Sequence, residues 1–199
     1  MDDQLQGATL FKLEGSTMRI QDEDYRLDTL FSENICADLG ERKAVFYGER
    51  ISDQAPAAIK LKFQMDPRAF PGVRECPWIK SFATDIFRRE VDALKATATV
   101  VGRHKLMADD TLVQGPHSDN PHGYIHVIVT QKMPGRPLNE YHNISAGEGS
   151  YVEEEVIRIL NGIYACGWSI YEGGSDEVLY DRETMTVYEM RFYLCLCIS

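Results

Sequence analysis

Apolar residues recur at helical spacing in two segments of the chain, residues 81–97 and residues 151–166. The apolar stripe of the first segment consists of Phe82, Ile86, Val91 and Leu94. Ser150 and Glu153 have the spacing of a capping box, which predicts that the second helix begins there. We therefore expect two amphipathic helices, each with one buried face.

Alternating and β-branched runs predict strands between these helices and before them. The expected strands cover residues 17–20, 44–47, 57–63 and 124–130. Residues 57–63 alternate apolar and basic side chains, which predicts a half-buried strand. The rest of the first 55 residues is interpreted as short strands and turns, and residues 66–78 and 108–123 as loops. A hairpin is expected near the end of the chain, pairing residues 177–180 with residues 185–188.

Composition limits the class of protein. The chain has 199 residues, of which 44% are hydrophobic, enough for one core or for two tightly packed lobes. It has no run of eighteen apolar residues and a polar, acidic start, so we expect neither a membrane span nor a signal peptide. Five Cys without a framework spacing predict reduced thiols and a cytoplasmic location.

Charge is distributed unevenly along the chain. The net charge of −10 argues against a general nucleic-acid binder. Residues 58–105, named the basic segment below, nevertheless hold ten of the 21 Lys and Arg against five Asp and Glu. Such a segment can meet a polyanion locally, or it can be the solvated face of one helix.

Residues 167–193, with the run Glu-Val-Leu-Tyr-Asp at 177–181, resemble the catalytic loop and metal-binding strand of the protein kinase-like superfamily. Residues 177–181, Glu-Val-Leu-Tyr-Asp, stand where the family has Asn-Ile-Leu-Tyr-Asp. Glu172 lies five residues earlier, at the place of the family's catalytic Asp, and Arg191 falls within the Asp-Phe-Gly position. The resemblance implies an inherited scaffold whose phosphoryl-transfer residues have been replaced.

Two upstream motifs extend this resemblance over roughly residues 40–193. Ala58-Ile59-Lys60 is similar to the strand that carries the family's phosphate-binding lysine, with Lys62 as an alternative two residues further on. The resemblance makes Glu90 the carboxylate partner of Lys60. It also places Met133 in the hinge beside the bound substrate.

The fold implied by the resemblance is α+β. It is a protein kinase-like small lobe, an antiparallel sheet plus one helix, followed by a truncated helical large lobe. Residues 1–133 would form the small lobe, with helix 81–97. Residues 134–199 would form the large-lobe fragment, with helix 151–166 and the terminal hairpin.

Several departures from the family argue against phosphoryl transfer. Arg191 at the metal-holding position repels magnesium, and the phosphate loop has one Gly where the family has three. We therefore expect no Mg-ATP, no other cofactor and no bound metal. His117, His122, His126 and Asp119 are interpreted as ordinary surface residues in preference to a metal site.

The predicted function is group transfer on a polar or polyanionic substrate, without phosphoryl transfer. Glu172 would act as general base, Lys60 and Arg191 would hold the anion, and Glu90 would orient Lys60. The predicted substrate-binding residues are Asp176, Glu177, Met133, Arg88 and Arg89. The substrate would be a small molecule or RNA-linked, for example an aminoacyl-tRNA used in peptide-bond formation.

Two alternatives stay open at this point. The first is a salt-bridge network among the same charged residues, with no chemistry. The second is a catalytically inactive pseudokinase-like protein that serves as a binding or scaffold module.

Overall fold

The computed structural model describes residues 9–74, 76–169, 178–189 and 195–197. The chain divides into two compact units. Unit 1 comprises Met1–Phe87 and Leu106–Lys132, and unit 2 comprises Arg88–Lys105 and Met133–Ser199. Helix α2 (Ile79–Ala96) therefore gives its first half to unit 1 and its second half to unit 2.

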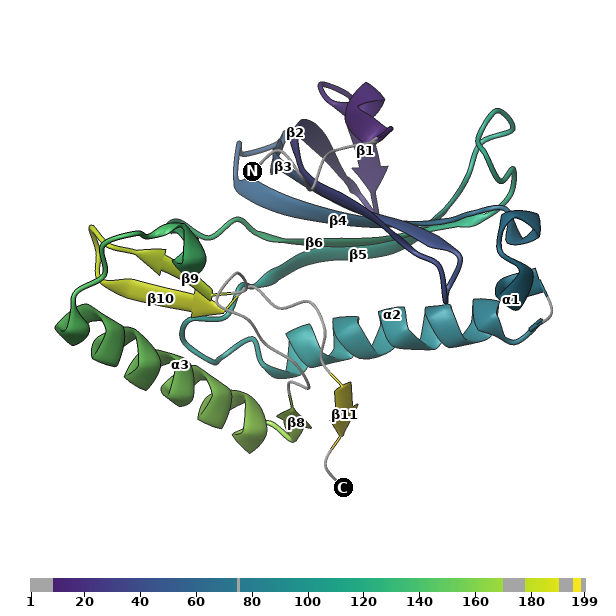
Figure 1. Cartoon of the computed structure of the whole chain (residues 1–199). Coiled ribbons are helices and arrows are strands. Elements are labelled where there is room, and N and C mark those ends of the chain that lie inside the picture. Colours follow the sequence, from purple (N-terminus) through teal and green to yellow (C-terminus); the bar gives the residue numbers. More distant parts are fainter. Residues whose placement is uncertain (1–8, 75, 170–177, 190–194, 198–199) are drawn as a thin grey trace. The chain divides into compact units, whose positions relative to one another are not determined.

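Unit 1 is built on a six-stranded antiparallel sheet (Figure 1). Its strands are β1 (Thr17–Ile20), β2 (Glu23–Cys36), β3 (Glu41–Arg50), β4 (Pro56–Gln64), β5 (Leu106–Val113) and β6 (Tyr124–Gln131). They pair in the order β1-β2-β3-β4-β6-β5. Consecutive strands are neighbours up to β4, and α2 then connects β4 to β5.

The sheet curls until its two edges approach each other. Two register shifts, both between Leu27 and Ser32, interrupt the pairing of β2 with β3, and such bulges bend a strand and increase its twist. At the turn after β1, the backbone N–H of Gln21 donates to Asp110 Oδ2 (2.9 Å). The side chain of Gln21 donates to the carbonyl of Asp109 (2.7 Å). The sheet is therefore barrel-like and nearly closed.

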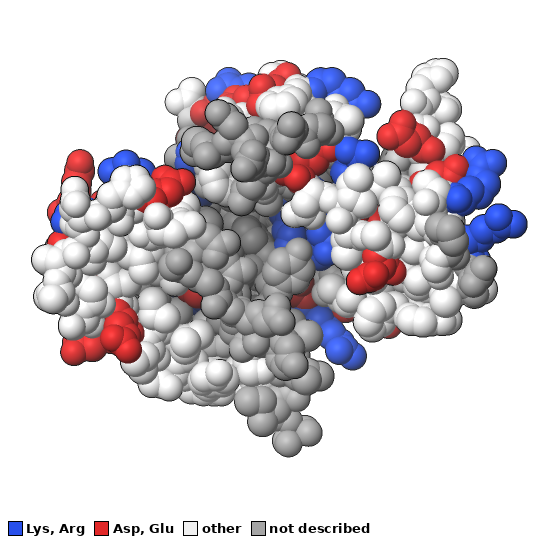
Figure 2. Space-filling model, in the orientation of Figure 1, with Lys and Arg blue, Asp and Glu red and all other residues white. Residues whose placement is uncertain are grey.

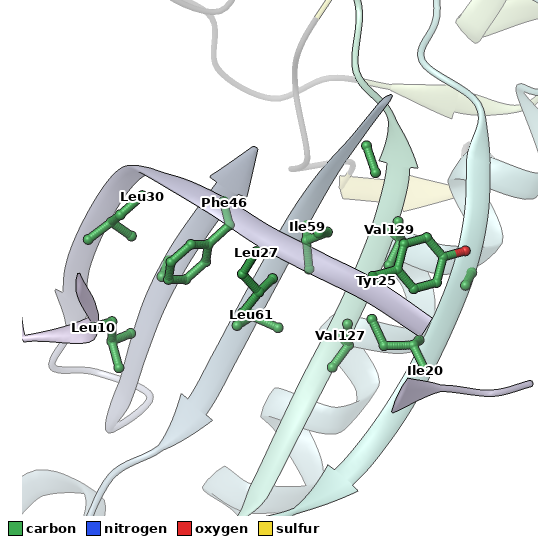
Figure 3. Packing of buried hydrophobic residues seen from close by; sticks show 13 residues of the cluster. Leu10, Ile20, Tyr25, Leu27, Leu30, Phe46, Ile59, Leu61, Val127 and Val129 are labelled. Carbon is green, nitrogen blue, oxygen red and sulfur yellow. The ribbon is translucent and has the colours of Figure 1, made fainter. Parts of the chain in front are cut away.

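The inner face of this sheet holds the core of unit 1 (Figure 3). Side chains alternate between the two faces of a strand, so Ile59 and Leu61 of β4 point to the same side as Val127 and Val129 of β6. The other large members of this cluster are Leu10, Ile20, Tyr25, Leu27, Leu30 and Phe46. Leu10 comes from the short helix η2 (Leu10–Leu13).

The first half of α2 packs against the opposite face of the sheet. Its Phe87 ring stacks on His126 of β6, with ring centroids 4.3 Å apart. Covered on both faces, β4 is buried continuously from Ala57 to Lys62. The prediction of a half-buried strand was therefore wrong, because period-two alternation does not reveal a second covering layer. Two short helices, η3 (Pro67–Ala69) and α1 (Pro71–Arg74), precede α2.

Unit 2 is organised around helix α3 (Ala146–Ala165). A three-stranded sheet has the order β10-β9-β7, formed by Thr186–Glu189, Val178–Asp181 and Arg136–Pro137. Helix η4 (Leu138–Glu140) follows β7, and β8 (Trp168–Ser169) pairs with β11 (Cys195–Cys197). The buried cluster of this unit consists of Ala93, Val152, Ile159, Ile163, Trp168, Tyr180 and Val187.

Helix α3 begins five residues before the predicted start. Ser145 is its N-cap: the Ser145 hydroxyl accepts from the Glu148 N–H (3.2 Å), and Glu148 Oε2 accepts from the Ser145 N–H (3.1 Å). The predicted capping box at Ser150 and Glu153 was wrong, although both boxes fit the same sequence pattern.

The predicted fold class was also wrong. The α+β, protein kinase-like small lobe with a truncated helical large lobe is replaced by a nearly closed antiparallel sheet and only a few helices. Two missed strands explain the difference. The fourteen-residue β2 was interpreted as short strands and turns, and β5 was assigned to the loop 108–123. With both strands present, the sheet curls around the core.

Candidate functional site

Four of the predicted site residues lie outside the described part of the chain: Glu172, Asp176, Glu177 and Arg191. The proposed general base and one of the proposed anion-holding groups are among them. The predicted catalytic arrangement therefore stays a prediction.

The remaining predicted residues are placed as follows. Lys60 on β4 and Glu90 on α2 are both buried, with exposed fractions of 4% and 2%. The alternative lysine, Lys62, is buried as well, and pairing of Glu90 with either lysine stays a prediction. Met133 is partly exposed, and Arg88 and Arg89 are exposed on α2. Lys60 is thus held inside the protein, which is unfavourable for direct contact with a large polyanion.

A polar row crosses the face of the unit 1 sheet that α2 covers. Directly paired residues of antiparallel strands point to the same face, and the register pairs Lys43 with Lys62, Lys62 with His126, and His126 with Thr111. Lys43 and Lys62 are 8% and 2% exposed. Like charges in directly opposite positions repel, so this row needs nearby compensation. The Glu41 carboxylate lies 3.9 Å from the Lys43 ammonium group.

His126 is fixed within this row by its neighbours. Its ring stacks with Phe87 and with Tyr124, at centroid distances of 4.3 Å and 4.1 Å. Nδ1 lies 3.0 Å from the Thr111 hydroxyl, and Nε2 lies 3.4 Å from the Thr84 hydroxyl. Both ring nitrogens therefore face hydroxyl groups, and His126 is only 1% exposed, so it is not the surface histidine that the sequence suggested.

The hydroxyl group of Tyr124 lies beside a buried carboxylate in this region. Burial raises the pKa of its hydroxyl far above the ordinary value, and the neighbouring Glu41 carboxylate raises the pKa further. The hydroxyl donates to Glu41 Oε1 at 3.0 Å. Because Glu41 is only 1% exposed, this hydrogen bond replaces the water that the carboxylate loses on folding.

A second buried charge pair lies in unit 2. Arg103, 3% exposed, binds the carboxylate of Glu189, which is 4% exposed. His104 Nδ1 lies 3.0 Å from the Glu189 carbonyl oxygen. No local pattern indicates this pair, because 86 residues separate Arg103 from Glu189. The pair ties the end of β10 to the segment after α2 and has a structural role.

The basic segment is less exposed than its sequence suggests. Three of its ten basic side chains are buried, Lys60, Lys62 and Arg103. Arg68 pairs with Asp66 at 2.7 Å. The other six are exposed: Arg74, Lys80, Arg88, Arg89, Lys95 and Lys105. Within the described residues, Arg74, Lys80, Arg89 and Lys105 form no ion pair. Apart from Arg68, the exposed basic side chains of the basic segment therefore lie between residues 74 and 105.

An aromatic pair stands beside the first of these charges. Trp78 and Phe82 are 59% and 46% exposed, and their rings meet edge to face with centroids 5.6 Å apart. The prediction that Phe82 belongs to the buried stripe of α2 was wrong. The buried face is instead formed by Ala83, Phe87, Val91 and Leu94. Trp78 and Phe82 are one helical turn apart and share a face, but this spacing alone does not show whether that face is buried.

No group of three or more His, Cys, Asp or Glu side chains suited to a metal ion occurs in the ranges that the structure describes. None of the described helices is long and apolar enough to cross a membrane.

No protein family model matches this sequence, and no curated protein matches it either. The comparisons thus identify no protein kinase-like relative.

Proposed function

We propose that the protein binds a polyanion, such as RNA or an RNA-linked substrate, through exposed basic residues of unit 1, Arg74 and Lys80. The observation that carries this proposal is the set of exposed basic side chains without an ion pair among the described residues: Arg74, Lys80, Arg89 and Lys105. On an ordinary surface, a basic side chain without an ion pair is simply solvated. Four of them within 32 residues of an acidic chain favour an anionic partner.

The net charge of −10 does not oppose such binding at close range. Solvent-exposed charges are screened beyond about 8 Å at physiological ionic strength. A phosphate held by Arg74 or Lys80 is therefore governed by its immediate surroundings, whereas the distant acidic residues reduce mainly the rate of encounter.

Salt dependence is the direct test. Each phosphate neutralised on a single strand contributes a slope of about −0.7 in log K against log salt. Contacts by Arg74 and Lys80 would give a slope of about −1.4, or roughly a 7-fold loss of affinity between 50 and 200 mM salt. Fluorescence anisotropy of a labelled 12-nucleotide RNA measures both quantities. Absence of binding at 50 mM salt would show that the proposal is wrong.

Charge-reversal variants locate the site. Lys80→Glu is expected to weaken RNA binding, because it replaces a phosphate contact with repulsion. Lys12→Glu is the matched control, because Lys12 is an exposed lysine of the same unit, in η2, and the change in net charge is identical. The double variant Arg88→Glu/Arg89→Glu tests whether the contact continues along α2. Equal effects of Lys80→Glu and Lys12→Glu would indicate a general charge effect without a site.

Group transfer on the bound molecule stays a prediction, because Glu172 and Arg191 lie outside the described residues. Glu172→Gln separates it from a binding module without chemistry. A catalytic role predicts loss of product with unchanged RNA affinity, whereas a pure binding module yields no product from either protein.

A further inference from the structure

Trp78 and Phe82 are large apolar side chains that the fold leaves in solvent. Trp78 is 59% exposed and Phe82 is 46% exposed, although the inward face of the same helix is well buried. Tryptophan is among the side chains whose burial stabilises a protein most, since its ring removes a large area from water. A pair of such rings on the surface therefore contributes little to folding and is available to a partner.

The backbone holds the two rings in a defined place. The Phe82 N–H donates to the Trp78 carbonyl (3.0 Å), and the Ser81 hydroxyl donates to the same carbonyl (2.7 Å). Ile79 directly follows Trp78, and Ala83 directly follows Phe82. These two residues are 8% and 1% exposed and anchor this turn. The edge-to-face contact between the rings limits their rotation further. Little conformational entropy is lost when such a surface binds a flat ligand.

One basic residue precedes the two rings in the sequence and another lies between them. Arg74 ends α1, four residues before Trp78, and Lys80 lies in the first turn of α2 between the two aromatic positions. Both are exposed and form no ion pair among the described residues. Figure 2 shows Lys and Arg side chains at the surface over the α1 region, on the right of the view.

We infer that Arg74, Trp78, Lys80 and Phe82 form a binding site for single-stranded nucleic acid. Unpaired bases stack on the rings, and Arg74 and Lys80 neutralise the flanking phosphates. This inference rests on the proposed function and names the class of polyanion. The rings decide the class: a duplex keeps its bases stacked inside and offers mainly phosphates, so it gains nothing from Trp78 and Phe82. An acidic peptide likewise presents carboxylates without a flat apolar surface.

The first measurement uses the intrinsic fluorescence of Trp78. The chain has two Trp residues, and the second, Trp168, is only 8% exposed in the core of unit 2. Titration with a single-stranded 12-nucleotide RNA at 50 mM salt is expected to quench the exposed indole and to protect it from iodide. The same sequence as a duplex is expected to bind more weakly and to leave the emission unchanged.

The second measurement uses anisotropy of labelled RNA and does not depend on either indole. Phe82→Ala and Trp78→Ala are each expected to weaken single-strand binding between about 5-fold and 150-fold, the range for loss of one stacked base. Trp78→Phe, which keeps a ring, is expected to retain part of the affinity. Phe11→Ala is the matched control, because Phe11 is 45% exposed in the same unit, outside the site. Circular dichroism confirms that each variant is folded.

Three outcomes are distinguishable. Loss of binding in the ring variants but not in Phe11→Ala supports the inference. Unchanged binding in both ring variants, or equal affinity for the duplex, overturns it, while a surviving effect of Lys80→Glu would leave the broader polyanion proposal intact. No RNA binding by the wild-type protein at 50 mM salt would overturn both.

Discussion

Gly48 allows the sharpest test of the nearly closed sheet of unit 1. It lies on β3 opposite Leu27, at the first register shift of β2. A Cβ atom at Gly48 would lie 1.8 Å from the backbone oxygen of Arg26 and 3.2 Å from Ile59 Cδ1. Ordinary contacts of a Cβ atom begin at 3.4 Å, so Gly48→Ala requires β2 and β3 to separate by more than 1 Å. The blocking atom belongs to the backbone, so no side-chain rotation can relieve the clash.

The expected cost follows from two contributions. Overpacking that forces backbone shifts costs about 1–3 kcal/mol. Separation of the strands also weakens at least one ladder hydrogen bond, which contributes about 1 kcal/mol. We therefore expect Gly48→Ala to lower the free energy of unfolding by about 3 kcal/mol. That is a large share of the 5–15 kcal/mol that is typical of a folded domain.

Urea unfolding followed by circular dichroism measures this difference, and hydrogen exchange of peptides from β2 and β3 locates it. Gly115→Ala is the matched control, because Gly115 lies in the same unit with no atom within 4 Å of the added Cβ and without a left-handed backbone. Its effect is expected to stay within about 0.5 kcal/mol. A Gly48→Ala protein within 1 kcal/mol of wild type would refute the close approach of β2 to β3, and with it the bulge that curls the sheet.

Three further predictions concern other parts of the fold. Tyr124→Phe removes the hydrogen bond to buried Glu41 and is expected to lower the free energy of unfolding by about 1–3 kcal/mol in urea titrations; an unchanged midpoint would contradict it. Arg182 hydrogen bonds, together with the N-cap, lower the pKa of Glu148 from 4.5 to about 2, so stability from this contact is present above pH 4.5 and lost towards pH 2. In the wild-type protein, the stability of the N-terminal turn of α3, measured by amide exchange, should therefore fall between pH 4.5 and pH 2. In Arg182→Ala this fall should be smaller. Ile159→Ala in the unit 2 core is expected to cost about 2–5 kcal/mol, measured by Trp168 fluorescence, and a loss below 1 kcal/mol would argue against tight packing there.

The local sequence pattern was sufficient to predict those helices and strands whose own residues show the expected apolar spacing. Helix 81–97 is observed as Ile79–Ala96, and the strand expected at 124–130 is observed as Tyr124–Gln131. The terminal hairpin is observed, with β9 (Val178–Asp181) paired to β10 (Thr186–Glu189), each strand one residue later than predicted. In each case the apolar spacing or the turn chemistry is a property of neighbouring residues, so it can be read without knowledge of the rest of the chain.

Only part of the candidate site could be predicted from the sequence. The count of basic residues identified the segment, but Lys60, Lys62 and Arg103 turned out to be buried, because the covering layers come from segments distant in sequence. Conversely, Phe82 was assigned to the core because apolar residues are usually inside. Its position on the outer face is decided by where Ala83 and Phe87 pack, and that is a tertiary property.

Local residue patterns are enough to locate single elements and to show that positive charge gathers in one segment of an acidic chain. Tertiary structure decided the fold, because strand β2 contains polar residues at many positions and only its partners β1 and β3 define it as one long, bulged strand. The same partners decide that the sheet curls towards closure at Gln21 and Asp110. Register, curvature and the burial of a lysine depend on contacts between residues far apart in the chain, and no local pattern records those contacts.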